Sequence, residues 1–329
     1  MLCLGIESTA HTFGVGIVSE KGDVLSNIKS VYRPREGWGI KPSEAAEHHR
    51  KFSTEVLERS LSEAGVNIKD IDLIAFSQGP GLPPCLVVGR DFAVELEKKL
   101  KKPLVGVNHC IAHIEIGKLF TKCKDPVTVY VSGGNTQILA YVSGRYRVFG
   151  ETQDIGLGNA LDKFGRALGM KFPSGPEIEK LAKHGRYVEL PYVVKGMDLS
   201  FSGIVTEAIK QVKEKGKKLE DVCFSFQETC FAMLTEVTER ALAHTNKNEV
   251  LLTGGVGANE RLQEMLKVMC EERGAKFYNC PKEFAGDNGA MIAWTGILAW
   301  KSNRFSITNA RIDILPRWRT DEVDVKWKN

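Results

Sequence analysis

The chain has 329 residues, of which 43% are hydrophobic and 26% are charged, and its formal net charge is +4. These values are ordinary for a globular protein, and so small a net charge does not by itself indicate binding to nucleic acid. No apolar run reaches the roughly 18 residues of a membrane-spanning helix, so we expect no membrane partner.

The N-terminus and the cysteines indicate the cellular compartment. The first residues, MLCLGIESTAHTFG, contain no basic stretch before the apolar ones, so we expect no signal peptide. The eight cysteines form no CxxC pair, which argues against both a zinc knuckle and a disulfide framework. We therefore expect a reduced, cytoplasmic protein, and its length favours about two domains.

Two stretches of the chain have the same order of elements. Residues 2–19 form a strand, a small polar turn and a second strand, and residues 127–142 repeat this order. A repeat at this distance favours a duplicated domain over a solenoid, whose units have roughly 20–50 residues. We predict one domain over 1–125 and another over 126–329, with the last helix and tail, about 287–329, packing back on the first.

Helical patterns alternate with strand patterns between and after these hairpins. We expect helices over 43–65, with Ser43 as the N-cap, 89–102, 227–244 and 286–300, strands over 71–81, 103–109 and 275–281, and a strand–turn–helix unit over 248–274. This alternation is typical of the α/β class, in which loops between the elements carry the functional residues.

Three turns of small residues follow predicted strands. They are Ser8-Thr9, Ser132-Gly133-Gly134-Asn135-Thr136 and Gly254-Gly255-Val256-Gly257-Ala258-Asn259. Glycines let backbone N–H groups approach phosphate oxygens, and the third turn opens a helix, whose N-terminus attracts anions. A single such turn is often only a tight connection, but the set of three favours a nucleotide site. The chain has neither a P-loop nor a GxGxxG motif.

Two carboxylates follow the second hairpin. Asp162 lies on a predicted helix, Gly175 lies in a Ser-Gly-Pro turn, and Glu179 lies at the start of the next helix. Such carboxylates accept hydrogen bonds from ribose hydroxyls in nucleotide sites, or they complement the dipole at a helix N-terminus. The residues by themselves leave both interpretations open.

His109 and His113 are four residues apart, so a helix would place both imidazoles on one face. The pair is either part of a metal site or two histidines that share a face. Zinc proteases of the HExxH type need a glutamate after the first histidine, and Cys110 stands there instead. Asp287 is the best candidate for a third ligand, and Tyr130 could add a phenolate to an iron-like metal.

Basic runs occur at 98–102 and 210–218, and Arg311, Arg317 and Arg319 lie near the C-terminus. Such runs form a solvated helix face or contact a polyanion. The residues do not distinguish between these roles.

Taken together, the motifs resemble one family, the tRNA N6-adenosine threonylcarbamoyltransferases, once called O-sialoglycoprotein endopeptidases. The matching stretches are GIESTAHTFGVGIV, SQGPGLPPCLVVG, VNHCIAHIEIG, YVSGGNTQ, DKFGRALGM, SGPEIEKLA, DLSFSG, GGVGANERL and GDNGAMIAW. The pattern is similar to the archaeal and eukaryotic branch, because the bacterial branch has an acidic pair where His11 and Thr12 stand. The resemblance implies an actin-like fold, shared with Hsp70 and sugar kinases, with two duplicated lobes and a nucleotide and metal cleft.

The resemblance also implies the site residues. The metal ligands would be His109, His113, Tyr130 and Asp287. The nucleotide-binding residues would be Tyr130, Val131, Ser132, Gly133, Gly134, Asn135, Asp162, Gly175, Glu179 and Asn259. One divalent metal ion is implied, with iron first and zinc or magnesium as alternatives, and the nucleotide ligand would be the adenylate donor or ATP.

The implied reaction transfers the threonylcarbamoyl group from L-threonylcarbamoyl-adenylate to N6 of adenosine-37 in tRNAs that read ANN codons, and it releases AMP. The implied partners are tRNA and the other KEOPS subunits, which are a small atypical kinase, a small dimerising subunit and a small regulatory subunit that binds the kinase. We have no firm candidate for a catalytic base, and Glu7 and His11 are hypothesised only from their place in the first hairpin. The alternatives are an actin-like ATPase or small-molecule kinase, a non-catalytic DNA- or chromatin-binding protein and the former protease assignment.

Overall fold

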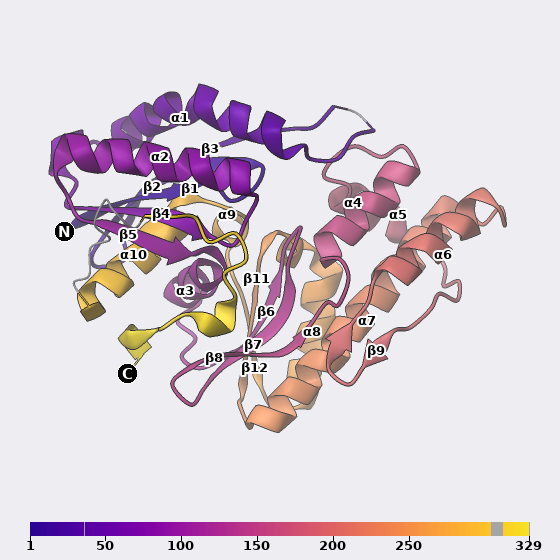
Figure 1. Cartoon of the computed structure of the whole chain (residues 1–329). Coiled ribbons are helices and arrows are strands. Elements are labelled where there is room, and N and C mark those ends of the chain that lie inside the picture. The colour runs from indigo at the N-terminus through magenta and orange to yellow at the C-terminus, as the bar shows by residue number, and fades with distance from the viewer. Residues whose placement is uncertain (36, 304–311, 329) are drawn as a thin grey trace.

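The computed structural model describes residues 1–35, 37–303 and 312–328, which form two five-stranded sheets flanked by helices (Figure 1). The strand orders are β3-β2-β1-β4-β5 and β12-β11-β6-β7-β8. The first sheet consists of β1 (Leu2–Glu7), β2 (Thr12–Ser19), β3 (Val24–Val31), β4 (Leu73–Gly79) and β5 (Leu104–Asn108). The second consists of β6 (Val127–Val131), β7 (Thr136–Val142), β8 (Arg145–Glu151), β11 (Glu249–Thr253) and β12 (Lys276–Asn279).

Helices cover both faces of the first sheet. The helices α1 (Pro42–Ala64) and α2 (Pro83–Leu100) pack on one face, and α3 (His109–Thr121) and α10 (Gly289–Asn303) pack on the other. Successive strand side chains point to opposite faces, so Leu4 and Ile6 join the core under α1 and α2, whereas Cys3 joins the core under α10. Burial on both faces explains why these strands are continuous apolar runs.

Helix α10 lies unusually close to β1 and β2. A Cβ atom on Gly5 would lie 2.2 Å from the backbone nitrogen of Ala293, which no real packing allows. Near the start of the helix, a Cβ on Gly14 would lie 3.1 Å from the nitrogen of Gly289. Gly14 is paired with Glu7 at the end of β1. Glycine in the strands therefore lets the start of α10 lie beside the end of β1.

The second sheet carries the larger hydrophobic core. Its helices are α4 (Leu157–Ala167), α5 (Gly175–Ala182), α6 (Ser202–Lys213), α7 (Leu219–Thr245) and α8 (Glu260–Glu272). All five contribute buried side chains to one cluster with β6, β7 and β11. Shorter elements are η1 (Ile68–Asp70), β9 (Val194–Lys195), β10 (Asp198–Leu199), η2 (Gly255–Ala258), α9 (Lys282–Ala285), η3 (Thr320–Glu322) and η4 (Lys326–Lys328).

The two sheets have the same connectivity. Each begins with an antiparallel meander, β1-β2-β3 or β6-β7-β8, and each adds two parallel strands beside the first strand of that meander. In the second sheet the added strands are β11 and β12, which are parallel to each other. The predictions of an α/β fold and of duplicated lobes are therefore confirmed.

Several predicted helix boundaries were wrong. The first helix begins at Pro42 after Lys41, so Ser43 lies inside the helix and is not its N-cap. The second begins at Pro83, before the expected residue 89. In both helices proline occupies the first turn, where its fixed φ is favourable and its missing N–H costs no hydrogen bond. The sequence patterns also did not predict α6 or the short β9–β10 pair.

The C-terminal segment 312–328 returns to the junction of the two sheets. Val323 and Val325 are buried against Ile111 of α3 and Tyr130 of β6. This segment therefore packs against elements of both sheets. Of the three arginines named near the C-terminus, Arg311 lies outside the described residues. Among the helices that the structure describes, none combines the length and apolar character needed to cross a bilayer.

Candidate metal centre and nucleotide site

Helix α3 presents His109 and His113 on one face. Asn108 caps the helix, because its side-chain oxygen accepts hydrogen bonds from the backbone nitrogens of Cys110 and Ile111 at 3.0 and 3.1 Å. The two imidazole rings lie one turn apart, with ring centroids 4.7 Å from each other. Both histidines are buried.

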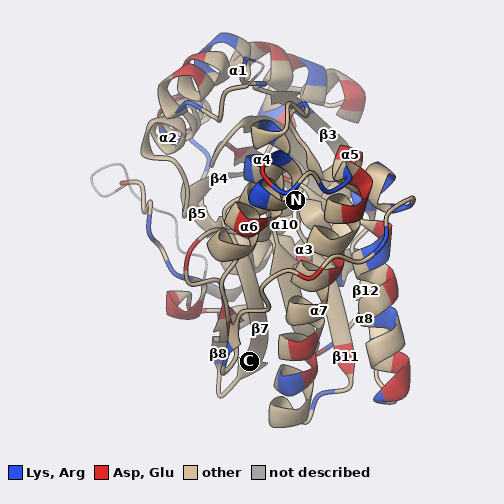
Figure 2. Ribbon diagram, turned by 90° about the vertical axis from the view of Figure 1, so that its right-hand side faces the viewer, with Lys and Arg blue, Asp and Glu red and all other residues tan. Residues whose placement is uncertain are grey.

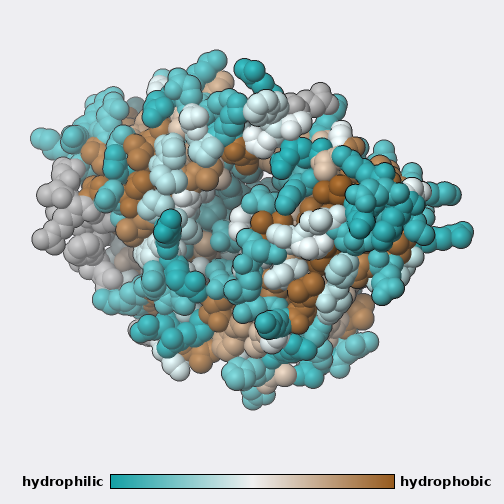
Figure 3. Space-filling view, turned by 45° about the vertical axis from the view of Figure 1, so that its right-hand side comes forward, coloured by the Kyte–Doolittle hydropathy of each residue, from teal (hydrophilic) through white to brown (hydrophobic). Residues whose placement is uncertain are grey.

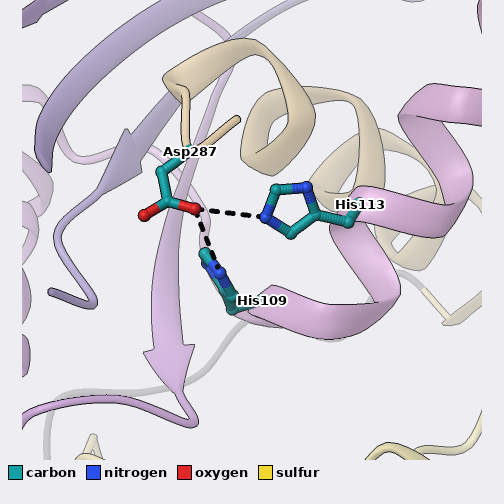
Figure 4. Close-up of side chains that lie close together, drawn as sticks. All are labelled: His109, His113 and Asp287. Atoms are coloured by element: carbon teal, nitrogen blue, oxygen red, sulfur yellow. Dashed lines mark hydrogen bonds and ion pairs between the residues drawn. The ribbon is translucent and has the colours of Figure 1, made fainter. Parts of the chain in front are cut away.

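Asp287 reaches this face of α3 from the segment that leads into α10. Its Oδ1 atom lies 3.3 Å from Nε2 of His113 and 3.5 Å from Nε2 of His109, as Figure 4 shows. The three candidate ligand atoms lie within 4.8 Å of one another. Two imidazoles and one carboxylate form a donor set that suits a first-row transition metal. The structure thus brings Asp287, which is 174 residues from His113 in the sequence, to the histidine pair.

Tyr130, at the end of β6, lies beside the same three side chains. Its ring centroid is 5.0 Å from that of His113. Its hydroxyl is wholly buried and has no hydrogen-bond partner among the described residues. A buried hydroxyl without a partner is costly, so this orphaned oxygen fits a site that is completed by a cation.

The Glu7 carboxylate forms a hydrogen bond with one of the candidate metal ligands, His109. Its Oε2 accepts a hydrogen bond from Nδ1 of His109 at 2.9 Å, and its Oε1 accepts one from the backbone nitrogen of Thr9 at 2.7 Å. The Glu7 side chain is fully buried. A carboxylate on Nδ1 fixes the ring so that Nε2 is directed towards Asp287. Glu7 is therefore oriented towards His109, and its hypothesised contact with an acceptor stays a prediction.

The charges of this cluster favour a cation. Burial alone lowers the pKa of His109, but the neighbouring carboxylates of Glu7 and Asp287 outweigh this effect and raise it to about 9. Burial raises the pKa of Asp287, but the two histidines outweigh it and leave that pKa well below its usual range. Burial also lowers the pKa of His113. One buried and one partly buried carboxylate beside two imidazoles thus attract positive charge, which a proton or a metal ion supplies.

The remaining polar side chains of α3 do not form a protease site. The Cys110 thiol is buried, which raises its pKa to about 12. Glu115 accepts hydrogen bonds from the Tyr146 hydroxyl at 2.9 Å and from Lys118 at 2.8 Å, away from the histidine pair. Within the described residues of this helix there is no carboxylate placed as the general base of a zinc protease, in agreement with the sequence.

The second and third glycine turns lie next to each other. The turn after β6 is closed by a hydrogen bond from the Ser132 nitrogen to the Asn135 oxygen at 2.8 Å, and it exposes Gly133 and Gly134. In the third turn Gly254 has φ +95°, and a Cβ there would lie 2.2 Å from the Val131 oxygen. The close contact places both backbone turns at the carboxyl ends of adjacent strands β6 and β11.

The predicted ribose-binding residues lie around α4, α5 and α8. The Asp162 carboxylate accepts a hydrogen bond from the Ser174 nitrogen at 2.7 Å, next to Gly175. Burial raises the pKa of Asp162. Glu179 accepts a hydrogen bond from the Glu260 nitrogen at 2.7 Å and so reaches the N-terminus of α8.

A cavity of about 450 Å³ lies between α5, α7 and α8, and Glu179, Gln227 and Arg261 are among the residues that line it. Asn259 donates a hydrogen bond to Gln227 at 2.9 Å and also caps α8. Sequence reasoning missed Gln227 and Arg261. Nothing in the local sequence indicates that a glutamine on an amphipathic helix, such as Gln227, lines a cavity. Arg261 follows the third glycine turn, and this position could have indicated that it lies near the site.

The chain is similar to known proteins along nearly its whole length. A model of the tRNA N6-adenosine threonylcarbamoyltransferase family matches residues 23–294. Proteins of that name from Thermococcus sibiricus and Thermococcus kodakarensis are 58% and 57% identical to the chain, and each match covers 99% of this chain and 100% of the relative. A probable bifunctional tRNA threonylcarbamoyladenosine biosynthesis protein from Methanocaldococcus jannaschii is 56% identical, and 99% of this chain matches 60% of it.

Solved structures show the same fold in more distant proteins. T. kodakarensis HypF superimposes with a TM-score of 0.64 at 15% identity, over 91% of this chain and 47% of that chain. The activator of 2-hydroxyisocaproyl-CoA dehydratase from Clostridium difficile, with bound ADPNP, superimposes with a TM-score of 0.55 at 12% identity, over 94% and 99%. At such identities the likeness concerns the fold alone.

Proposed function

Since the chain belongs to the tRNA N6-adenosine threonylcarbamoyltransferase family, we propose that it transfers the threonylcarbamoyl group from L-threonylcarbamoyl-adenylate to N6 of adenosine-37 in tRNA, releasing AMP. The observation that carries this conclusion is the identity to its relatives along the full chain. The acceptors are tRNAs that read ANN codons.

In this reaction the N6 amine of the acceptor attacks the carbonyl carbon of the donor. A new N–C bond forms, the bond from that carbon to the phosphate oxygen breaks, and AMP leaves with the electron pair. The amine loses one proton to the surroundings. The protein must therefore hold a mixed anhydride next to a nucleobase and keep water from the same carbonyl.

We assign the metal ligands to His109, His113, Asp287 and Tyr130. The close approach of the first three and the unpartnered hydroxyl of the fourth support this assignment. A divalent ion held there, iron first and zinc or magnesium as alternatives, would neutralise the negative oxygens of the donor and orient the anhydride. The role of Glu7 is to position His109 through the Nδ1 hydrogen bond.

We assign the adenylate, or ATP as an alternative ligand, to the surface between the second and third glycine turns. Tyr130 and the backbone from Val131 to Asn135 would face its phosphate. Gly175 would let the nucleoside approach the start of α5 without a side chain in the way. The carboxylates of Asp162 and Glu179 would accept hydrogen bonds from the ribose, and Asn259 would hold the start of α8 beside it. The cavity lined by Glu179 supports this placement.

We further propose that the enzyme works in the cytoplasm with the other KEOPS subunits, namely a small atypical kinase, a small dimerising subunit and a small regulatory subunit. Some relatives are named as probable bifunctional tRNA threonylcarbamoyladenosine biosynthesis proteins, and the match covers about 60% of their length. In such a relative a second activity is part of the same chain, and this supports a functional partnership between this chain and separate proteins. The two lobes would comprise residues 1–125 and 126–329, and the packing of α10 on the first sheet supports the return of the C-terminal part to the first lobe.

The test is a transfer assay with purified donor and an ANN-reading tRNA, with and without chelator and partner proteins. We expect the modified nucleoside and AMP in equal amounts, and loss of both with chelator. Absence of the modified nucleoside under every combination would contradict the proposal. Nucleotide hydrolysis that needs neither donor nor tRNA would favour the alternative of an actin-like ATPase or small-molecule kinase.

A further inference from the structure

We propose that the loop between β3 and α1, one face of α4 and the turn before α5 together receive the anticodon loop of the acceptor tRNA. This inference rests on the proposed function, since it states where the RNA lies and not whether RNA is the substrate. We call this surface the acceptor rim. It consists of Arg33, Arg35, Trp38, Lys163, Arg166 and Lys171.

The parts of the acceptor rim come from both lobes and meet in space. A Cβ atom on Gly39 would lie 3.3 Å from a guanidinium nitrogen of Arg166, so the β3–α1 loop contacts α4. Figure 1 shows this loop, which leads into the start of α1, extending towards α4. A second contact joins the lobes nearby, where the rings of His11 and Phe172 lie 5.6 Å apart.

The acceptor rim is continuous with the candidate metal centre. The Tyr32 nitrogen, at the start of the loop, donates a hydrogen bond to the His11 oxygen at 2.8 Å. His11 belongs to the turn that follows Glu7, and Glu7 holds His109. Figure 3 shows the surface hollowed between the two halves of the molecule. A polymer lying on the rim could therefore present one unstacked base to the site.

The cations of the acceptor rim are exposed. Within the described part of the chain, Arg33, Arg35, Lys163, Arg166 and Lys171 form no ion pair with a carboxylate. Hydrogen bonds from the Tyr32 hydroxyl and Lys41 lower the pKa of Glu44 on α1, and the nearby charge of Arg35 adds to this effect without a salt bridge. Lys163 and Arg166 are three residues apart and thus share one side of α4, whose basic positions are blue in Figure 2. Five exposed cations without a salt bridge among the described residues fit a polyanion.

Trp38 adds a stacking surface among these cations. The side chain is 57% exposed, which is unusual for so large an apolar group. The ammonium of Lys41 lies 4.2 Å from its ring centroid and covers only one face. Unstacked bases of single-stranded RNA stack on aromatic rings, and each such contact is worth roughly 1–3 kcal/mol. An anticodon loop combines exposed bases with phosphates, which matches a loop that carries an exposed indole together with Arg33 and Arg35.

The lysine-rich runs of the sequence are less suited to this role. The runs at 98–102 and 210–218 include the last turns of α2 and α6, at opposite outer edges of the molecule in Figure 1. Lys102 and Lys215 are paired with Asp72 and Glu207. These runs carry no exposed aromatic residue. Binding of an anticodon loop calls for positive charge to contact phosphates and for an exposed aromatic ring to stack on bases. The acceptor rim has both, whereas the lysine-rich runs have only the charge.

The test measures binding of a fluorescent anticodon stem-loop to the full chain, alone and with its partner proteins. We expect Trp38→Ala to weaken binding by roughly 5- to 160-fold, and Trp38→Phe to remain within about 3-fold of the wild type. Replacing Arg33 and Arg35 together by alanine should reduce the slope of log K against log salt by about 1 to 2. Replacing Lys98 and Lys99 together is the control, with the same change in charge and little expected effect.

Thermal unfolding, metal content and partner binding of the same variants separate an effect on RNA binding from other effects. Unchanged thermal unfolding and metal content of the Trp38 and arginine variants would show that the loss lies in RNA binding. The inference is overturned if these variants bind and modify RNA like the wild type, or if they bind RNA normally and lose only a partner protein. If instead the wild-type protein forms no modified nucleoside at all, the proposed function has failed, and this is visible without any variant.

Discussion

The Glu7 carboxylate lies 2.9 Å from Nδ1 of His109, on the side of the imidazole ring opposite to Asp287. The hydrogen bond selects the tautomer with a free Nε2 and restricts rotation of the ring. By contrast, Nδ1 of His113 is buried without a partner among the described residues. The two candidate ligands are thus held differently, and the orientation of His109 on α3 depends on a residue of β1.

Replacing this carboxylate should weaken metal binding. We expect Glu7→Gln to lower the affinity for a divalent metal by about 10- to 100-fold, because the ring loses its charged orienting partner. Calorimetric titration of the metal-free protein measures the change. Glu115→Gln is the matched control. Glu115 is a second buried glutamate and lies on α3, but it accepts hydrogen bonds from Tyr146 and Lys118 and not from His109. Equal losses in both variants would contradict the specific role of Glu7.

Removing the metal should reduce both stability and transfer. A ligand that binds only the folded state stabilises it by about 2.7 kcal/mol at 100 times its dissociation constant. We expect chelated protein to unfold at a lower temperature and to regain transfer when Fe²⁺, Zn²⁺ or Mg²⁺ is returned, to an extent that identifies the competent ion. In Asp287→Asn protein, which lacks one anionic ligand, the chelator should cause a smaller shift. An equal shift in that variant would argue against Asp287 as a ligand.

The Asp162 carboxylate should contribute to donor binding. We expect Asp162→Asn to raise the KM for the donor by about 10-fold with little change in kcat, because a neutral amide accepts weaker hydrogen bonds from ribose than a carboxylate does. The amide oxygen can still accept the bond from the Ser174 nitrogen, so the local fold is kept. Steady-state kinetics at saturating tRNA measures both constants. Asp125→Asn, an exposed site, serves as the control.

The close approach of α10 to β1 should not tolerate a side chain. In Gly5→Ala protein the new methyl group would lie 2.2 Å from the Ala293 nitrogen, so the helix must shift. We expect a loss of at least about 1–3 kcal/mol in the free energy of unfolding, measured by urea denaturation, and weaker metal binding because Asp287 precedes this helix. Gly203→Ala is the control, since a Cβ there has open space. It should be neutral or slightly stabilising.

His49 should make the protein less stable in weak acid. The side chain is fully buried and donates Nε2–H to the Ala10 oxygen at 3.0 Å. Burial, with a further contribution from His48, lowers the pKa of His49 from 6.5 to about 4. The unfolded chain therefore binds a proton before the folded chain does. The stabilisation present above pH 6.5 is lost as the pH falls from 6.5 to about 4, and amounts to about 3 kcal/mol.

Urea unfolding of wild-type and His49→Gln protein between pH 7.5 and 4 measures this effect. The glutamine amide can still donate to the Ala10 oxygen but does not titrate in this range. We expect the variant to lose less stability than the wild type over the same interval. Parallel pH dependences in the two proteins would show that His49 is protonated equally in the folded and unfolded states.

Local patterns were reliable where neighbouring residues decide the geometry. The apolar runs at 2–7 and 13–19 became β1 and β2, and the four-residue spacing placed His109 and His113 on one face of α3. The predicted first residues of the helices were less reliable, because several successive residues are each suited to the first turn of a helix. Thus α7 begins at Leu219, before the expected residue 227, with Glu220 and Asp221 complementing the helix dipole.

The sequence by itself determined the α/β class, the duplication and the candidate ligands, because periodicity and short spacings act over one or two turns of chain. Only the tertiary structure decided that Glu7 holds His109 and that the loop carrying Trp38 meets Arg166. It also showed that glycine in β1 lets α10 bring Asp287 within 3.3 Å of His113. These contacts join residues that are far apart in the chain, so their geometry depends on how whole elements pack and not on local preference.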